Sequence, residues 1–166
     1  MKLAQLKKDK MFLIKKLVHS LNIEGKKKLA GIVFVESKNN IFEEVSESIM
    51  LRGGLAHSTH GGFVALFLDS LDSLDLIKSS IEILQKAKSL GVRAKIGINI
   101  GEIILEETPS GLVKYASLGN SLSNAKKLAK IENAIAVCDN IHKDVEDKFR
   151  FEKLNFGWMI KGPVLG

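Results

Sequence analysis

The run over residues 29–35, LAGIVFV, constrains the fold more than any other segment of the chain. Its residues are apolar or glycine, and Ile32, Val33 and Val35 are β-branched. A continuous apolar run of this length is too short for a buried helix and is typical of a strand covered on both faces. The sequence therefore predicts a sheet with this strand in its interior, ending at the polar residue Glu36.

The rest of the chain alternates between strand-like runs and helical segments. Gly61-Gly62 predicts a tight turn between strands at residues 55–60 and 63–68. Helical spacing predicts helices at residues 41–50, 69–90, 119–131 and 139–147. Further strands are expected at residues 92–105, 113–118, 134–138 and 149–154. This order predicts an α+β fold, a mostly antiparallel sheet with helices packed on one face.

Basic charge is concentrated at the N-terminus. The chain has a net charge of +6, but residues 1–28 hold nine lysines against Asp9 and Glu24, and the remaining residues are close to neutral. Domains that bind nucleic acid carry a basic surface, so a nearly neutral body argues against nucleic acid as a partner.

Apolar residues between Leu3 and Leu21 recur at near-helical spacing among these lysines, which predicts an amphipathic helix. We expect this helix to pack on the domain or on a partner chain, and contact with a membrane surface is the alternative. The expected organisation is a basic amphipathic helix at residues 1–28, a globular domain at 29–156 and an irregular tail at 157–166.

The sequence gives no sign of export or membrane insertion. No apolar stretch has the length of a membrane span, and the N-terminus lacks the long apolar core of a signal peptide. The single cysteine, Cys138, lies in an apolar run and is expected to be a small core residue rather than a nucleophile. A lone thiol suits a reducing compartment, so we expect a cytoplasmic protein.

Three segments, in this order along the chain, carry a family resemblance. Residues 53–67 resemble the pattern G-x-V-x-K-x-x-G-D-G-x-L-A-x-F, residues 96–104 (IGINIGEII) resemble G-I-x-x-G-E, and residues 115–128 (YASLGNSLSNAKKL) resemble Y-x-x-x-G-D-x-V-N-x-A-x-R-L. Together they resemble the class III adenylyl/guanylyl cyclase catalytic domain over residues 31–154. The resemblance implies a ferredoxin-like nucleotidyl cyclase fold. It also implies a dimer, because the active sites of this family form between two chains.

The resemblance fails at the metal site. Family members hold two metal ions on the substrate triphosphate with two aspartates, and the ribose 3′-oxygen then attacks the α-phosphate. The first aspartate falls at Glu36, which keeps a carboxylate on a longer arm. The second falls at Gly61, which supplies no ligand. The loop after the first strand also lacks the family's Gly-Phe-Thr-like segment, so metal and triphosphate binding are expected to be weak.

The nucleotide-binding positions depart in the same way. The two base-recognition positions fall at His57 and Ala116, and the alanine side chain cannot hydrogen-bond a purine. The ribose-positioning asparagine falls at Ser123, with Asn124 adjacent. The transition-state arginine falls at Lys127, which keeps the charge but loses the two-pronged guanidinium.

These departures predict a catalytically degenerate cyclase-like domain that acts in signalling by dimerisation or partner binding. The partner would be a second copy or another cyclase-like domain, and a nucleotide is a candidate ligand. No cofactor is expected, and Mg²⁺ or Mn²⁺ would be needed only if cyclase activity remains. The alternative is a divergent active cyclase that makes a cyclic nucleotide from ATP or GTP with Glu36 and Lys127 in substitute roles.

Smaller features leave further alternatives open. The turn His60-Gly61-Gly62-Phe63 also resembles diguanylate cyclases, but it lacks their acidic residues. His57 and His60 are either polar hairpin residues or metal ligands with Glu36, and their spacing favours the former. A set of lysines forms either a solvated helix face or an anion-binding patch near the helix start at Gly119. These lysines are Lys114, Lys126, Lys127 and Lys130.

Overall fold

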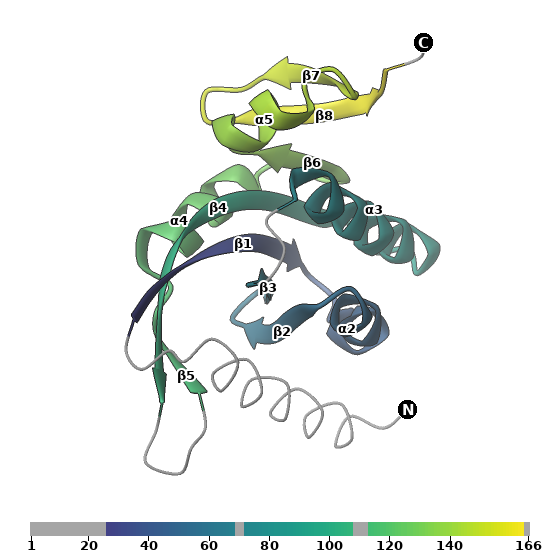
Figure 1. Ribbon diagram of the computed structural model, residues 1–166. Coiled ribbons are helices and arrows are strands. Elements are labelled where there is room, and N and C mark those ends of the chain that lie inside the picture. The colour runs from purple at the N-terminus through teal and green to yellow at the C-terminus, as the bar shows by residue number, and fades with distance from the viewer. Residues whose placement is uncertain (1–25, 69–71, 108–112, 165–166) are drawn as a thin grey trace.

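The computed structural model describes residues 26–68, 72–107 and 113–164, and its strands form one eight-stranded sheet (Figure 1). The strands lie in the order β2-β3-β1-β4-β6-β8-β7, and β5 pairs with the C-terminal part of β4. Among the described pairs only β4 and β6 are parallel, so the prediction of a mostly antiparallel α+β fold is confirmed. The strands are β1 Lys26–Ser37, β2 Gly54–Thr59, β3 Gly62–Phe67, β4 Ala94–Glu107, β5 Val113–Ser117, β6 Ala134–Val137, β7 Phe149–Lys153 and β8 Trp158–Pro163.

Strand β1 lies in the interior of the sheet, as the apolar run predicts. It pairs antiparallel with β3 on one side and β4 on the other. Ile32, Val33 and Val35 are fully buried. The strand is longer than the apolar run, because Lys26 to Lys28 continue the pairing with the C-terminal part of β4.

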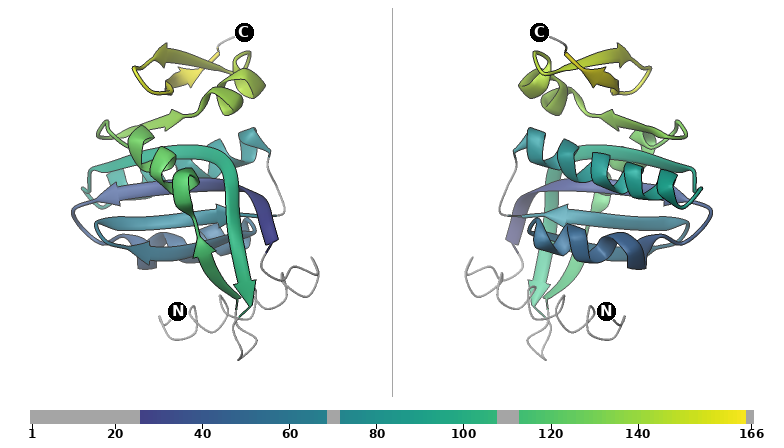
Figure 2. Two further views of the ribbon diagram at one scale, coloured as in Figure 1. Left: turned by 90° about the vertical axis from the view of Figure 1, so that its left-hand side faces the viewer. Right: turned by 90° about the vertical axis from the view of Figure 1, so that its right-hand side faces the viewer.

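The helices cover both faces of the sheet, which corrects the prediction of a single covered face (Figure 2). Helices α2 (Phe42–Leu51), α3 (Ser73–Ser89) and α5 (Asp139–Val145) pack on the face that buries Val33 and Val35. Helix α4 (Gly119–Leu128) packs on the opposite face, over Ile32 and Phe34. Successive residues of a strand point to opposite faces, so the apolar run of β1 supplies both cores.

Small residues bring α4 against β4. A Cβ on Gly97 would lie 2.1 Å from the carbonyl oxygen of Ala125, so no side chain fits between the helix backbone and the strand. One turn earlier, the hydroxyl of Ser121 donates to the carbonyl oxygen of Glu102 at 2.6 Å, and the buried Asn99 amide donates to the carbonyl oxygen of Ser121 at 3.0 Å. The helix ends at Leu128, before the predicted residue 131.

The C-terminal segment differs most from the prediction. Residues 158–163 form β8, which lies between β6 and β7, so the expected irregular tail over 157–166 is wrong there. The Trp158 indole stacks on His142 of α5 with ring centroids 3.7 Å apart, and its Nε1 donates to Asp139 at 2.9 Å. Cys138, which precedes α5, is half-buried against the same core.

The predicted N-terminal amphipathic helix falls mostly on residues 1–25, which lie outside the described residues. Its last three residues belong to β1, so the expected boundary at residue 28 cuts through that strand. In the part of the chain that the structure describes, no helix is long and apolar enough to cross a membrane.

Candidate functional site

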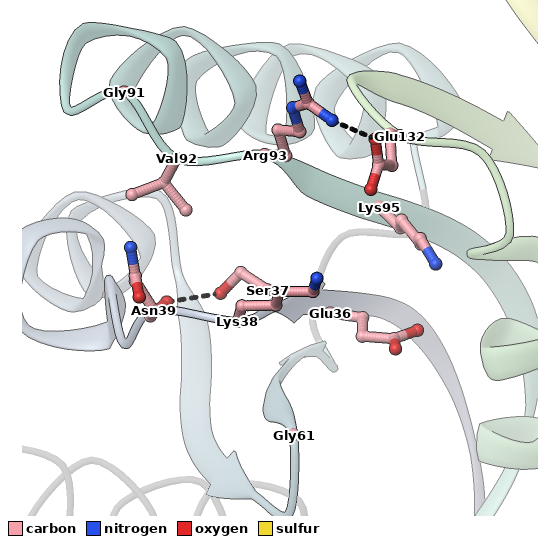
Figure 3. Close-up of a pocket in the computed structure, with 10 residues that line it drawn as sticks. All are labelled: Glu36, Ser37, Lys38, Asn39, Gly61, Gly91, Val92, Arg93, Lys95 and Glu132. Atoms are coloured by element: carbon pink, nitrogen blue, oxygen red, sulfur yellow. Dashed lines mark hydrogen bonds and ion pairs between the residues drawn. The ribbon is translucent and has the colours of Figure 1, made fainter.

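A pocket of about 560 Å³ opens at the edge of the sheet where β1 ends (Figure 3). Four elements meet there: the end of β1 with the loop after it, the β2–β3 turn, the start of β4 and the loop before β6. The pocket is lined by Glu36, Ser37, Lys38, Asn39, Gly61, Gly91, Val92, Arg93, Lys95 and Glu132.

The β2–β3 turn is held against the end of β1. Gly62 pairs with Glu36, and a Cβ on Gly62 would lie 1.9 Å from the carbonyl oxygen of Val35. The Ser37 amide donates to the carbonyl oxygen of Gly61 at 3.3 Å. Gly61 itself has a φ of +82°, and a Cβ there would meet no atom within 4 Å. The turn therefore fixes residue 61 at the pocket while leaving open space where a side chain would be.

Cations outnumber carboxylates among the lining residues. Arg93 and Glu132 form an ion pair of 3.2 Å. The lining charges that remain are two cations, Lys38 and Lys95, and one carboxylate, Glu36. Lys95 lies directly across from Glu36 in the β1–β4 pairing, so both side chains project from the same face of the sheet. Within the described residues, Glu36 forms no ion pair shorter than 4.0 Å.

The comparison with solved structures identifies the architecture. The guanylyl cyclase domain of the RhoGC fusion protein from the aquatic fungus Blastocladiella emersonii matches with a TM-score of 0.64 and 15% identity, over 86% of this chain and 100% of that one. The adenylyl cyclase CyaB from P. aeruginosa matches with a TM-score of 0.62 and 16% identity, over 87% and 97%. The chain has the class III nucleotidyl cyclase fold. No protein-family model matches the sequence, and a search of curated proteins finds no match.

An adenylate/guanylate cyclase/hydrolase from Silicibacter pomeroyi matches at 20% identity, with a TM-score of 0.61 over 84% of this chain and 98% of that one. At these identities the likeness establishes the cyclase fold, and the chemistry depends on this chain's own residues. The glycines of the G-I-x-x-G-E motif contribute packing, since Gly97 lies under the α4 backbone.

The residues at the pocket do not fit the two-metal site of the cyclase fold. Glu36 and Gly61 lie at the pocket together, as the resemblance predicts, but only Glu36 carries a carboxylate. The other acid of the lining, Glu132, is paired with Arg93. No group of three or more His, Cys, Asp or Glu side chains that could hold a metal ion occurs among the described residues. Metals of this kind are held by one or two carboxylates together with substrate phosphates and waters. Apart from the paired Glu132, this lining offers the single carboxylate of Glu36 where two metal ions would need two.

The predicted positions on α4 lie outside this pocket. Ser123, Asn124 and Lys127 are on α4, and none of them lines it. Ser123 and Lys127 are exposed, whereas Asn124 is half-buried. The Lys127 ammonium lies 5.6 Å from the ring centroid of Phe156 in the β7–β8 turn, in the range of a cation–π contact. Ala116 belongs to β5, and its side chain lies outside the described part of the structure.

Two histidines and four lysines had open alternatives, and of these the Lys114 side chain lies outside the described part of the structure. His57 is exposed on β2, and His60 is exposed in the turn that follows. These two histidines and Glu36 belong to no group of three or more possible metal ligands among the described residues. Lys126 is exposed, and its ammonium lies 5.5 Å from the Phe34 ring.

Sequence reasoning missed three charged residues of the pocket: Arg93, Lys95 and Glu132. Arg93 and Lys95 immediately precede the recognised motif at residues 96–104, and this position was the available signal. Glu132 had no local signal, because it reaches the pocket only through the parallel pairing of β6 with β4.

Proposed function

We propose that this chain is a catalytically degenerate nucleotidyl cyclase-like domain that acts in signalling by dimerisation or partner binding. The observation that carries the proposal is the pocket at the end of β1, where Glu36 faces Gly61 and Lys95 instead of a second carboxylate. A lysine beside the one retained carboxylate provides a positive charge at a site where a metal would need negative ligands.

The α4 positions support the same conclusion. Two-metal phosphoryl chemistry relies on charge stabilisation and positioning, and the loss of a transition-state arginine costs about 10³-fold or more in related enzymes. Lys127 supplies a single point charge in place of the arginine fork and lies against Phe156. A domain with these substitutions keeps its shape, which suits association better than turnover. The cytoplasmic location and the lack of a cofactor remain predictions.

The direct test is a cyclase assay on the purified full chain with ATP or GTP and Mn²⁺. We expect no cyclic nucleotide above a protein-free control. Turnover that disappears in Glu36→Ala would overturn the proposal and establish the divergent active cyclase. Sedimentation of the full chain tests the association part, because a strictly monomeric protein that binds no cyclase-like domain would not fit it.

A restoration experiment tests the reason for the missing metal site. Gly61→Asp places a carboxylate in the open space beside Glu36, and Asp tolerates a positive φ better than most residues. We expect Mn²⁺ to raise the melting temperature of Gly61→Asp while leaving the parent unchanged, since a ligand that binds only the folded state stabilises it. Gly61→Asn is the matched control, with the same shape and no charge. Equal shifts in both variants would contradict the explanation.

A further inference from the structure

A groove of about 480 Å³ runs between α2 and α3, on the face of the sheet opposite α4. The right-hand view of Figure 2 shows the two helices side by side on this face, α2 in blue and α3 in teal. The groove is lined by the buried Val45 and Ile83 and by three charged residues, Glu44, Glu82 and Lys86. None of the positions that the cyclase resemblance places between two chains lies on α2 or α3, so the groove is separate from the site that two chains would share.

Helix α2 carries acidic residues without a basic one. Its charged residues are Glu43, Glu44 and Glu47, all of them exposed, and it contains no Lys, Arg or His. None of these three glutamates forms an ion pair with another described residue. Glu82, on the α3 side of the groove, is already paired with Arg52. The α2 side of the groove is therefore complementary in charge to a basic segment.

Two exposed leucines lie at the end of the sheet where β1 begins. Leu51, the last residue of α2, is 83% exposed, and Leu29 of β1 is 46% exposed. Leu29 is four residues before Val33, so it points to the same face of the sheet, the one that α2 covers. Pairing through β3 sets Gly54 level with Gly31, so α2 ends close to the start of β1. Apolar surface is thus available between the start of β1 and the groove.

The segment that precedes β1 has the matching chemistry. Residues 1–25 lie outside the described residues, and their sequence holds six lysines against Asp9 and Glu24. Their apolar residues predict an amphipathic helix, whose apolar stripe needs another surface to cover it. In helical form this segment would be about 37 Å long, against about 15 Å for α2, and it is tethered at Lys26, where β1 begins. It is therefore long enough to lie along the whole groove.

We propose that residues 3–21 dock as a helix in the α2–α3 groove of their own chain. The apolar stripe covers the two exposed leucines, and the lysines face the three glutamates of α2. Because the segment joins β1 at the end where α2 finishes, it runs along the groove in the same direction as α2, with Leu21 near Leu51. The docked segment contacts the helix that directly follows Lys38 and Asn39, two residues of the pocket.

Disulfide cross-linking in the full chain tests the docking. The reporter pairs are Leu51→Cys with Leu17→Cys or with Leu21→Cys, in a Cys138→Ala background that removes the only natural thiol. We expect a cross-link within one chain, seen as a species of monomer mass that migrates faster on a non-reducing gel. At least one pair should form it at least about tenfold faster than the control, because docking raises the effective concentration of the two thiols. The control joins the same N-terminal cysteine to Phe156→Cys, an exposed residue beside α4.

Charge reversal tests the contribution of α2. Reversal of its three glutamates to lysine should slow the cross-link about tenfold, because repulsion replaces attraction between exposed charges. Reversal of three lysines of the segment in the same chain should restore the rate. Reversal of three exposed acids outside α2 makes the same charge change as the first variant and should leave the rate unchanged. These variants are, in this order, Glu43→Lys/Glu44→Lys/Glu47→Lys, Lys7→Glu/Lys8→Glu/Lys10→Glu and Glu146→Lys/Asp147→Lys/Glu152→Lys.

Glu43 and Glu44 also complement the dipole of α2, so the melting temperature of each variant is measured in parallel. If the α2 reversal does not fold, Glu43→Gln/Glu44→Gln/Glu47→Gln replaces it and should also slow the cross-link. A cross-link no faster than the control, one that joins two chains, or a rate that charge does not change would overturn the proposal. Sedimentation measures the association of chains separately, so this docking and the proposed function can fail independently.

Discussion

The α4–β4 contact and the β2–β3 turn both depend on glycine, for opposite reasons. At Gly97 the helix backbone occupies the space of a side chain, with the Ala125 oxygen 2.1 Å from where a Cβ would lie. At Gly61 the space is open, and only the positive φ favours glycine. The first region keeps the fold together, whereas the second has room for a side chain that the chain does not supply. The residues that hold this domain together are therefore different from the residues that would have to supply chemistry at the pocket.

The largest effect should come from Gly97→Ala. A Cβ there meets backbone atoms, which cannot turn aside, so α4 must move away from β4. We expect a loss of about 3 kcal/mol, at the upper end for an overpacked core site, measured as a shift of the urea midpoint. A loss no greater than that of Gly61→Ala would break the comparison between the two regions.

A smaller effect is expected for Gly61→Ala. The methyl group meets no atom, and the cost is that of holding alanine at a φ of +82°, about 1 kcal/mol. Urea unfolding measures it under the same conditions as Gly97→Ala. Gly61→Asn should cost less than alanine, because asparagine adopts positive φ more readily. If the two substitutions cost the same, contacts instead of backbone conformation would govern this turn.

The smallest effect should come from a surface contact between α2 and α3. Arg52 at the end of α2 pairs with Glu82, and its hydrogen bond to that carboxylate is the main cause of a lowered Glu82 pKa. Both side chains are more than a third exposed, at 36% and 42%, so Glu82→Gln should cost only about 0.5 kcal/mol at neutral pH.

The pH dependence of this contact has a defined sign. A carboxyl whose pKa is lowered in the folded state stabilises the fold at pH values above its unfolded-state pKa. That contribution disappears as the pH falls through the lowered pKa of the folded state. The difference between the parent and Glu82→Gln should therefore vanish in acid, measured by urea unfolding at successive pH values. Glu152→Gln, an exposed residue outside the described ion pairs, is the control and should show no such difference.

Local patterns predicted the elements well where the core contact was made by apolar side chains. The run at residues 29–35 lies in an interior strand and is buried from Ala30 onward, and the Gly61-Gly62 turn lies where the sequence places it. The face of α4 was missed because small residues make its contact with β4, and glycine and alanine carry little hydrophobic signal. Strand β8 was missed because it is only partly buried, and because its pairing with β6 joins segments about 20 residues apart that no local pattern connects.

The site was predictable only in part for a related reason. The resemblance assigned Glu36, at the end of the first strand, and Gly61, in the turn motif, to the two metal-binding positions, and both residues line the pocket. The charges around them depend on strand register: Lys95 reaches Glu36 only through the β1–β4 pairing. Such pairings are non-local, so a reading of segments one at a time cannot find them.

Strand β8 also determines how the domain can open. The β7–β8 hairpin joins the rest of the sheet through two residue pairs, Ala136 with Met159 and Val137 with Trp158. Because only two residue pairs join this hairpin to the sheet, it should detach locally at a lower free energy than global unfolding requires. Its amides should therefore exchange hydrogen before those of β1. Trp158 belongs to one of these two pairs and is the only tryptophan of the chain, so its fluorescence would report the detachment of the hairpin.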